Sequence, residues 1–181
     1  MKKVLSLAFL IGSAFLVSAQ MTLSSGSQIV VASGSTLIVN DVVNTLGTIT
    51  NSGTVSVKGD VTNNDGGLFH NTSSGTVTFT GSSAQEVTGA ATVHFYGTLD
   101  INNSSGVSIT NTTTGAAQEV HGALSFTSGK LTLNNFDLIL GTTDPTGTGA
   151  SAYIVTNGTG QLKRVVAASD VIFPVGNSTY N

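Results

Sequence analysis

A short pattern recurs along this chain: a glycine, a polar residue, and then two apolar residues separated by one polar residue. The pattern stands at 53–59 and returns at 75–81. A second unit, Ala-Gln-Glu-Val-x-Gly, stands at 84–89 and returns at 117–122. Repetition at such intervals is typical of chains in which similar short units stack on one another. The repeats therefore constrain the fold more than any other feature.

Apolar and polar residues alternate within these units and also between them, as in Val93-His94-Phe95, so each predicted strand buries one side only. The predicted strands are about three to five residues long, and few are joined by the Asn-Gly or Asp-Gly link of a tight hairpin. A parallel solenoid stacks such strands about 4.8 Å apart around one apolar column. We therefore predict an all-β fold, a right-handed parallel β-helix (β-solenoid), whose handedness follows from the general preference of parallel crossovers. An antiparallel β-sandwich is the alternative.

The stacking of coils predicts which side chains are buried. The offset of the first unit, from 53 to 75, corresponds to one coil, whereas the offset of the second, from 84 to 117, fits either a coil with a longer turn or one and a half coils. The pairs Asn63-Asn64, Asn102-Asn103 and Asn134-Asn135 are expected to satisfy turn backbone and to stack between coils. The predicted core comprises Val77, Phe79, Val87, Val93, Phe95, Leu99, Ile101, Val120, Leu124, Phe126, Leu131 and Leu133.

The start of the chain has the pattern of a secretory signal peptide. Lys2 and Lys3 precede an almost unbroken apolar stretch at 4–17, which is followed by small residues. About 14 apolar residues are too few for the roughly 20 that span a bilayer as a helix. We therefore predict cleavage between Ala19 and Gln20.

The mature chain is predicted to be exported, because the signal peptide covers 1–19. It is also predicted to contain no membrane span, because no second long apolar run follows the signal peptide. We assign solenoid repeats to 20–140, and a loop with a continuing β segment to 141–181.

The formal charge of the chain is −3, with six basic and nine acidic residues, and loss of the two lysines of the signal peptide makes it −5. Since binding to phosphate needs clustered Lys and Arg, we expect no nucleic-acid partner. There is no cysteine to carry a lipid anchor.

The mature chain, from about Gly26 to Asn181, resembles the repeat region of large secreted β-helix surface proteins of Bacteroidota. The resemblance rests on the Ala-Gln-Glu-Val-x-Gly units, the Gly-x-Leu-x-Leu-Asn-Asn unit, Leu138-Ile139-Leu140-Gly141, Gly160-Gln161-Leu162-Lys163-Arg164, and Phe173-Pro174-Val175-Gly176 through Tyr180.

This resemblance implies a structural or adhesive role at the cell surface, with an extracellular surface or polysaccharide as partner. Proteins of this type often end in a sorting domain for the type IX secretion system. No such domain is present here, so either the chain is a fragment, with further domains of the parent chain beyond Asn181, or export ends in the periplasm or the medium. Nothing after Phe173 resembles a terminal cap, so we expect the open sheet edge of the last coil to self-associate. The family provides no catalytic residues that carry over to this chain.

Few residues have the chemistry of a catalytic or metal site, and we assign no catalytic, cofactor-binding or metal role to any. Glu119 and His121 flank Val120 and share the outward side of one strand, where they could orient a water or hold a metal. The simpler interpretation is a solvated polar pair opposite buried Val120. The three histidines, His70, His94 and His121, are spaced close to a coil period, which could stack them in a column.

Two further functions share this architecture. A carbohydrate-active β-helix is the first alternative, although the mature chain has only four basic residues and no tryptophan for such a site. An ice-binding solenoid is a minor alternative, suggested by the outward Thr76, Thr78 and Thr80. The acidic pair Asp60 and Asp65 could suggest calcium binding, but its spacing matches neither an EF-hand nor the Gly-Gly-x-Gly-x-Asp repeat.

Overall fold

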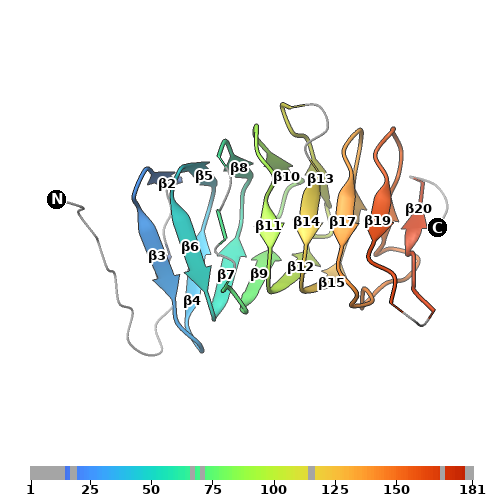
Figure 1. Cartoon of the computed structure of the whole chain (residues 1–181), viewed down its shortest axis with the longest axis horizontal. Helices are drawn as coiled ribbons and strands as arrows, with labels where there is room; N and C mark the ends of the chain where they lie inside the picture. Colours follow the sequence, from blue (N-terminus) through green and yellow to red (C-terminus); the bar gives the residue numbers. More distant parts are fainter. Residues whose placement is uncertain are drawn as a thin grey trace.

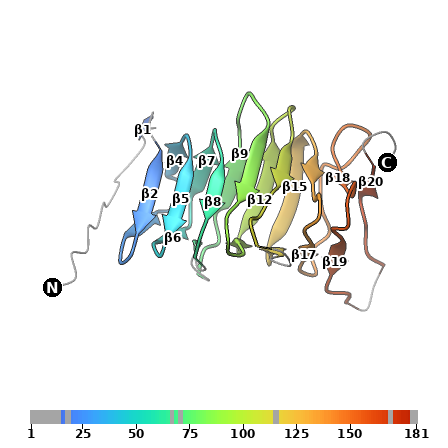
Figure 2. The same ribbon diagram turned by 90° about the horizontal axis from the view of Figure 1, so that it is seen from above.

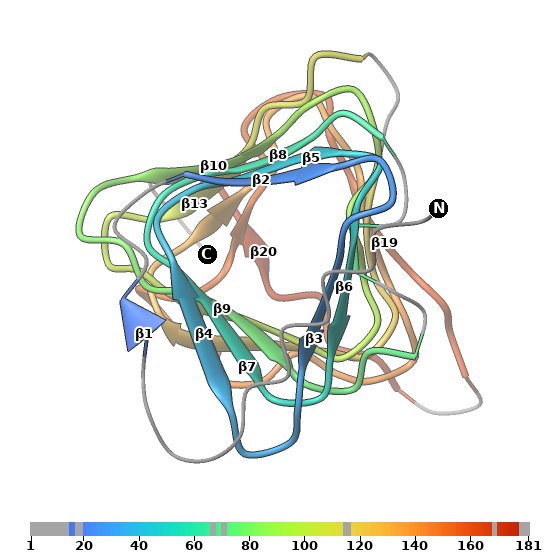
Figure 3. The ribbon, with the colours of Figure 1, turned by 90° about the vertical axis from the view of Figure 1, so that its left-hand side faces the viewer.

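The computed structural model describes residues 15–16, 20–65, 68–69, 72–113, 117–167 and 170–177. Over these residues the chain forms a parallel β-solenoid of about six coils, three-sided in cross-section (Figures 1 and 3). Strand β2 (Met21–Ser24) and strand β20 (Val175–Gly176) lie at opposite ends of the stack (Figures 1 and 2). Seen from the β2 end, the chain passes clockwise around the three sides as it recedes, so the solenoid is right-handed (Figure 3).

Each side of the prism is one face, numbered in the order in which the chain visits it. The first face contains β2, β5 (Val42–Thr45), β8 (Val61–Asn63), β10 (Gln85–Thr88), β13 (Val107–Ile109), β16 (Leu131–Thr132), β18 (Ile154–Val155) and β20. The second face contains β3 (Gln28–Val31), β6 (Thr48–Asn51), β11 (His94–Phe95), β14 (Gln118–Val120), β17 (Leu138–Leu140) and β19 (Leu162–Arg164). The third face contains β1 (Phe15–Leu16), β4 (Thr36–Val39), β7 (Thr54–Val57), β9 (Thr76–Phe79), β12 (Thr98–Asn102) and β15 (Ala123–Ser128).

The second face consists of two hydrogen-bonded sheets, β3-β6 and β11-β14-β17-β19. A parallel bridge from Ile49 to Phe69 extends the first of them, and the Phe69 and Phe95 rings lie 5.6 Å apart. All pairings between named strands are parallel. The all-β solenoid prediction is therefore confirmed, and the antiparallel sandwich is excluded.

Coil-to-coil register on the third face explains the offset of the first sequence unit. Val55 pairs with Val77, and Val77 pairs with Leu99, so the offset from 53 to 75 is one coil. Coil length varies elsewhere: the step from Leu37 to its partner Val55 is shorter, and the step from Val61 to its partner Val87 is longer. The extra residues of these steps lie in turns, because the paired strands keep their register; a register shift occurs elsewhere, between Ile101 and Asn102 of β12.

The offset of the second unit is about one and a third coils, which neither interpretation of the sequence foresaw. Gln85 lies on the first face, where it pairs with Val107, whereas Gln118 lies on the second face. The unit that follows moves by one face as well, from Thr98–Asn102 on the third face to Leu131–Thr132 on the first. A three-sided coil has three similar corner-and-strand units, so one sequence unit can recur at a different corner.

The predicted core is confirmed in full. All twelve residues predicted to face the interior are buried, and buried positions alternate with more exposed ones along β9, β12 and most of β15. The same apolar column continues towards both ends, from Leu23 to Ile154. Burying one such side chain contributes roughly 1.5–3 kcal/mol, so the column is the main stabilising feature of the prism.

Stacked glycines form the corner before the third face and account for the recurring glycine of the sequence pattern. A Cβ atom on Gly75 would collide with the carbonyl oxygen of Gly53, and one on Gly97 would collide with that of Gly75. These backbones therefore approach one another too closely for any side chain.

Buried asparagines form the corner that follows the first face. Asn44 donates from Nδ2 to Asn63 Oδ1 at 2.8 Å and to the Asp65 carbonyl at 3.0 Å, and its Oδ1 accepts the Gly47 N–H at 2.8 Å. Asn63 in turn donates to the Thr92 carbonyl at 2.7 Å. The predicted stacking of turn amides between coils is confirmed at this corner.

Gln85 has the same role at the corner before the first face. Its Oε1 accepts hydrogen bonds from the Gly81 N–H and from Asn103 Nδ2, while its Nε2 donates to the carbonyls of Val57 and Gly59. A single buried amide thereby connects three successive coils. The glutamine of the second copy, Gln118, is also buried, and its Oε1 accepts the Val93 N–H at 2.7 Å.

The segment after Leu140 continues the same solenoid. Strand β18 pairs with β16 and then with β20, and β19 pairs with β17, while Thr146 in the intervening loop forms one bridge with Ser125 of β15. Of the predicted signal peptide the structure describes only Phe15–Leu16, which pairs with β4. Cleavage after Ala19 stays a prediction. None of the described segments is a helix long and apolar enough to cross a membrane.

Replacing Phe126 by Ala is expected to lower the free energy of unfolding by about 3–5 kcal/mol, because Phe126 is only 4% exposed and its removal leaves a cavity. Thr127→Ala is the matched control, since Thr127 is the exposed neighbour on the same strand, and it should change stability by roughly 0.5 kcal/mol or less. Denaturant unfolding of the three proteins measures both values. Equal losses of unfolding free energy in the two variants would contradict the inward position of Phe126 and the outward position of Thr127 on β15.

Replacing Asn63 by Ala is expected to lower the free energy of unfolding by about 1–3 kcal/mol, because it leaves the partly buried Thr92 carbonyl without this donor and removes one acceptor of buried Asn44. The adjacent Asn64→Ala variant is the control, because the Asn64 side chain is exposed. Urea unfolding provides the comparison. If the Asn64 variant lost as much stability as the Asn63 variant, the amide ladder would not be what stabilises this corner.

Candidate functional site

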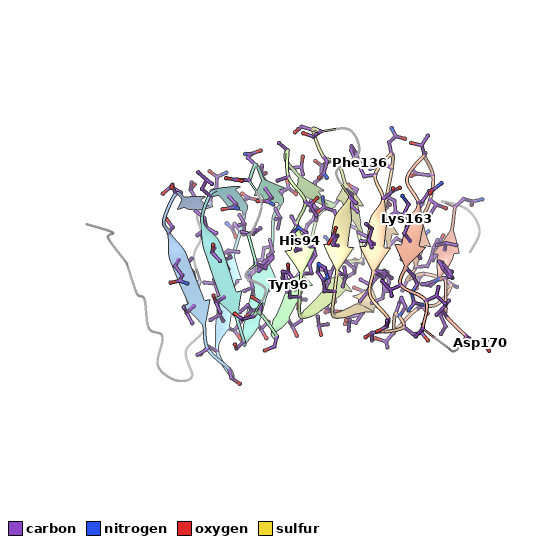
Figure 4. All side chains as sticks on the ribbon, viewed as in Figure 1. His94, Tyr96, Phe136, Lys163 and Asp170 are labelled. Atoms are coloured by element: carbon purple, nitrogen blue, oxygen red, sulfur yellow. The ribbon has the colours of Figure 1, made fainter. Side chains whose placement is uncertain are left out.

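Four chemically distinctive side chains gather on the outer surface of the second face. His94 lies on β11 and Glu119 on the neighbouring β14, while Tyr96 and His121 directly follow these two strands. We call these four residues the histidine cluster. Figure 4 shows His94 and Tyr96 on the side of the prism that faces the viewer, near the middle of the stack.

Local alternation and coil register together assemble this cluster. Phe95 and Val120 point inward and pair with each other, so their neighbours His94 and Glu119 point outward and also pair. The ladder continues by one bond, from the His121 N–H to the Phe95 carbonyl at 2.9 Å. His121 is thereby held in the coil next to Tyr96, although a full coil of chain separates the two in sequence.

The carboxylate of Glu119 lies between the two imidazoles. Its Oε2 is 3.0 Å from His94 Nδ1 and 3.0 Å from His121 Nε2, and these two nitrogens are 3.3 Å apart. The side chains are partly exposed, at 30% for His94, 28% for Glu119 and 44% for His121. Solvent and small solutes can therefore reach the three atoms.

Ring stacking restricts the orientation of the imidazoles. The Tyr96 and His121 rings are nearly parallel, with an interplanar angle of 6° and centroids 4.5 Å apart. The His94 ring stacks less closely on both, at 6.0 Å from Tyr96 and 5.6 Å from His121. Stacked rings keep their hydrogen-bonding edges in fixed directions, here towards Glu119.

The sequence-based pairing of Glu119 with His121 is correct but incomplete. Glu119 lies on β14 and His121 directly follows that strand, and the two side chains meet on the outer surface, as their spacing indicated. Sequence reasoning connected His94 with His121 as members of a column of histidines, but it did not connect His94 with Glu119, which is one coil away, and it did not include Tyr96. The hypothetical column of histidines forms between His94 and His121, and His70 lies outside the described residues.

The repeated copy of the same motif has a different environment. Glu86 is the counterpart of Glu119, but it lies on the first face, where its Oε2 accepts a hydrogen bond from the Thr110 hydroxyl at 3.0 Å. Thr88 stands where the other copy has His121. The copies thus provide an internal comparison between a motif with imidazoles and one without.

Of the acidic pair Asp60 and Asp65, which was considered for calcium binding, Asp60 forms hydrogen bonds within the protein. Its Oδ1 accepts the Glu86 N–H at 2.7 Å, and its own N–H donates to Asp41 Oδ1 at 2.8 Å. In the part of the chain that the structure describes, only His94, Glu119 and His121 form a group of three His, Cys, Asp or Glu residues with close ligand atoms.

Two ion pairs lie near the C-terminal end of the second face. Lys163 is 2.5 Å from Asp137 Oδ2, and its hydrogen bond is the main cause of a lowered pKa at Asp137. Arg164 Nη1 lies 2.6 Å from Asp144 Oδ1, and its hydrogen bond, followed by one from the Ile172 N–H, lowers the pKa of Asp144.

Arg164 also joins separate parts of the chain. Its guanidinium is fully buried and donates to the carbonyls of Thr142, Thr143 and Ile172. Arg164, the last residue of the motif at 160–164, therefore connects the loop after β17 to the segment that leads into β20 through hydrogen bonds.

Asp144→Asn is expected to destabilise the protein at neutral pH and to have progressively less effect in acid. Because folding lowers the pKa of Asp144, its contribution is present above the ordinary aspartate value of roughly 3.9 and is lost as the pH falls through the lower folded value. Melting temperatures of the wild type and variant between pH 7 and pH 3 measure this. Asp170→Asn, at an exposed position, is the control. A difference that persists undiminished in acid would contradict the pairing.

Comparison with known proteins identifies no relative: no protein-family model, no curated protein and no solved structure matches this chain. The chain is therefore described by its β-solenoid fold alone.

Proposed function

We propose that this chain is an exported structural or adhesive surface module with no catalytic role of its own. The observation that carries the proposal is the continuous apolar column, which runs through the coils from Leu23 to Ile154 and leaves the outward positions mainly to short polar side chains. A chain of this kind forms a rigid prism with extended, repetitive faces. Such faces suit a spacer or a contact surface.

The third face illustrates that surface. Its outward positions place Thr36, Thr54, Thr76 and Thr98 in one row, each paired with the next coil. Hydroxyl groups repeated at the coil spacing of about 4.8 Å offer many equivalent hydrogen-bonding positions along a line. An extended polysaccharide or an extracellular surface is the partner class that this regular polar row favours.

The predicted leader at 1–19 supports export, and the resemblance of the repeats supports a place among secreted β-helix surface proteins of Bacteroidota. Four basic residues in the mature chain argue against a nucleic-acid partner, because phosphate binding needs clustered positive charge. We accordingly propose a secreted or cell-surface location.

A carbohydrate-active enzyme is the less favoured alternative. Glycoside hydrolysis typically uses two carboxylates that flank the scissile bond. The histidine cluster instead contains one carboxylate, Glu119, between two imidazoles. This composition favours binding over acid/base hydrolysis.

Ice binding is favoured by one observation, the threonine row on the third face. The neighbouring outward row is less uniform, since it contains Ile38, Ser56, Thr78 and Asp100 in successive coils. A charged residue within the row interrupts the flat hydroxyl surface, so adhesion remains the proposal.

Beads coated with residues 20–181 are expected to be retained on at least one extracellular polysaccharide or matrix surface, whereas beads coated with the heat-unfolded chain are not. The same polysaccharides, incubated with soluble protein, should keep their length by size-exclusion chromatography. Retention by neither form would contradict the adhesive role. Polysaccharide cleavage that disappears in Glu119→Gln would establish the enzyme alternative instead.

A further inference from the structure

We propose that His94, Glu119 and His121 form a binding site for a divalent transition-metal ion of the zinc type. The inference is independent of adhesion, because it concerns three donor atoms rather than the polar faces. Those atoms are His94 Nδ1, Glu119 Oε2 and His121 Nε2, one from each residue.

The spacing of the donors matches the coordination sphere of such an ion. Zinc lies about 2.0–2.2 Å from imidazole nitrogen and carboxylate oxygen, so two of its ligands are about 2.9 Å apart at right angles and about 3.3 Å apart at tetrahedral angles. The separations between Glu119 and the two histidines are 3.0 Å, and the two histidine nitrogens are 3.3 Å apart. One ion can therefore contact all three donors without rearrangement of the backbone.

The donor types determine which ion fits. Two neutral imidazoles and one carboxylate suit Zn²⁺, Cu²⁺ and Ni²⁺, whereas Ca²⁺ and Mg²⁺ prefer oxygen ligands throughout. The Glu119 carboxylate supplies a negative charge that partly neutralises the ion. Lys163, a positive charge that would repel the ion, lies two coils away in the same outward row. It is roughly 10 Å from Glu119 and is paired with Asp137.

The supporting structure holds the donors in place before any ion binds. Tyr96 stacks on the His121 ring at 4.5 Å, and the backbone ladder fixes His94 opposite Glu119. Preorganised ligands favour metal binding, since little side-chain freedom remains to be lost. Three protein ligands also leave room for a water as a further ligand, because the cluster is partly exposed.

A bound ion would connect two coils. His94 belongs to one coil, and Glu119 and His121 belong to the next, so the ion would join segments that are one coil apart in sequence. An ion that binds only the folded chain raises its stability with increasing ion concentration. Zinc should therefore raise the melting temperature of the protein.

The test is calorimetric titration of tag-free residues 20–181 with Zn²⁺. We expect saturable binding of one ion per chain, weakened in His94→Ala, Glu119→Gln and His121→Ala by more than the roughly 10–100-fold typical of an outer-shell loss. Glu86→Gln is the matched control, since Glu86 occupies the same motif position but its carboxylate accepts a hydrogen bond from Thr110, and it should bind as the wild type does. Ca²⁺ and Mg²⁺ should give no saturable heat.

A second readout separates loss of a ligand from loss of structure. Co²⁺ bound by these donors should give visible absorption bands that Glu119→Gln abolishes, while the far-ultraviolet circular dichroism and metal-free melting temperature of that variant stay near those of the wild type. No saturable zinc binding, or equal binding in the wild type and all three ligand variants, would overturn the proposal. Binding retained in Glu119→Gln but lost in both histidine variants would also overturn it, because the carboxylate would not be a ligand.

Discussion

The backbone hydrogen bonds between successive coils determine almost everything else in this molecule. They hold each strand in parallel register with the strand one coil earlier, as in the series Val55, Val77 and Leu99. Inward positions therefore stack on inward positions, and the interior accepts only side chains that pack as a column. Corners stack on corners, so each corner must satisfy its own polar groups at the same spacing.

Only a few residue types meet the requirement that a corner satisfies its polar groups at the coil spacing. Where two backbones nearly touch, as at Gly75 and Gly97, the chain has no room for a side chain. Where a corner points its polar side chains inward, the buried amides of Asn44, Asn63 and Gln85 substitute for missing backbone partners. An unsatisfied buried polar group costs about 1–3 kcal/mol, which is comparable to the contribution of one core side chain. Removing one partner of a buried corner amide is therefore expected to destabilise the prism about as much as removing one core side chain.

Outward side chains neither pack in the apolar column nor pair the polar groups of the corners, so they differ from face to face. The third face presents threonine rows, whereas the described part of the second face presents the histidine cluster in one place only. A surface for extended partners and a site for a small ion are therefore compatible on one prism. An ion at the cluster would also reinforce the contact between two coils, which links the site to the rigidity that a spacer or adhesive module needs.

Alternation is a local property that a short segment such as Val93-His94-Phe95 already displays, so the amino-acid sequence predicts the inward side of such strands and the core residues on them. The sequence also identifies asparagine as a stacking turn residue. The length of each coil was not readable, since turns absorb the differences between a short step such as Leu37 to Val55 and a long one such as Val61 to Val87. For that reason only the tertiary structure placed Gln118 on a different face from Gln85 and brought His94 against Glu119. Contacts between coils depend on register, and register is set by hydrogen bonds between segments about one coil apart rather than by any local pattern.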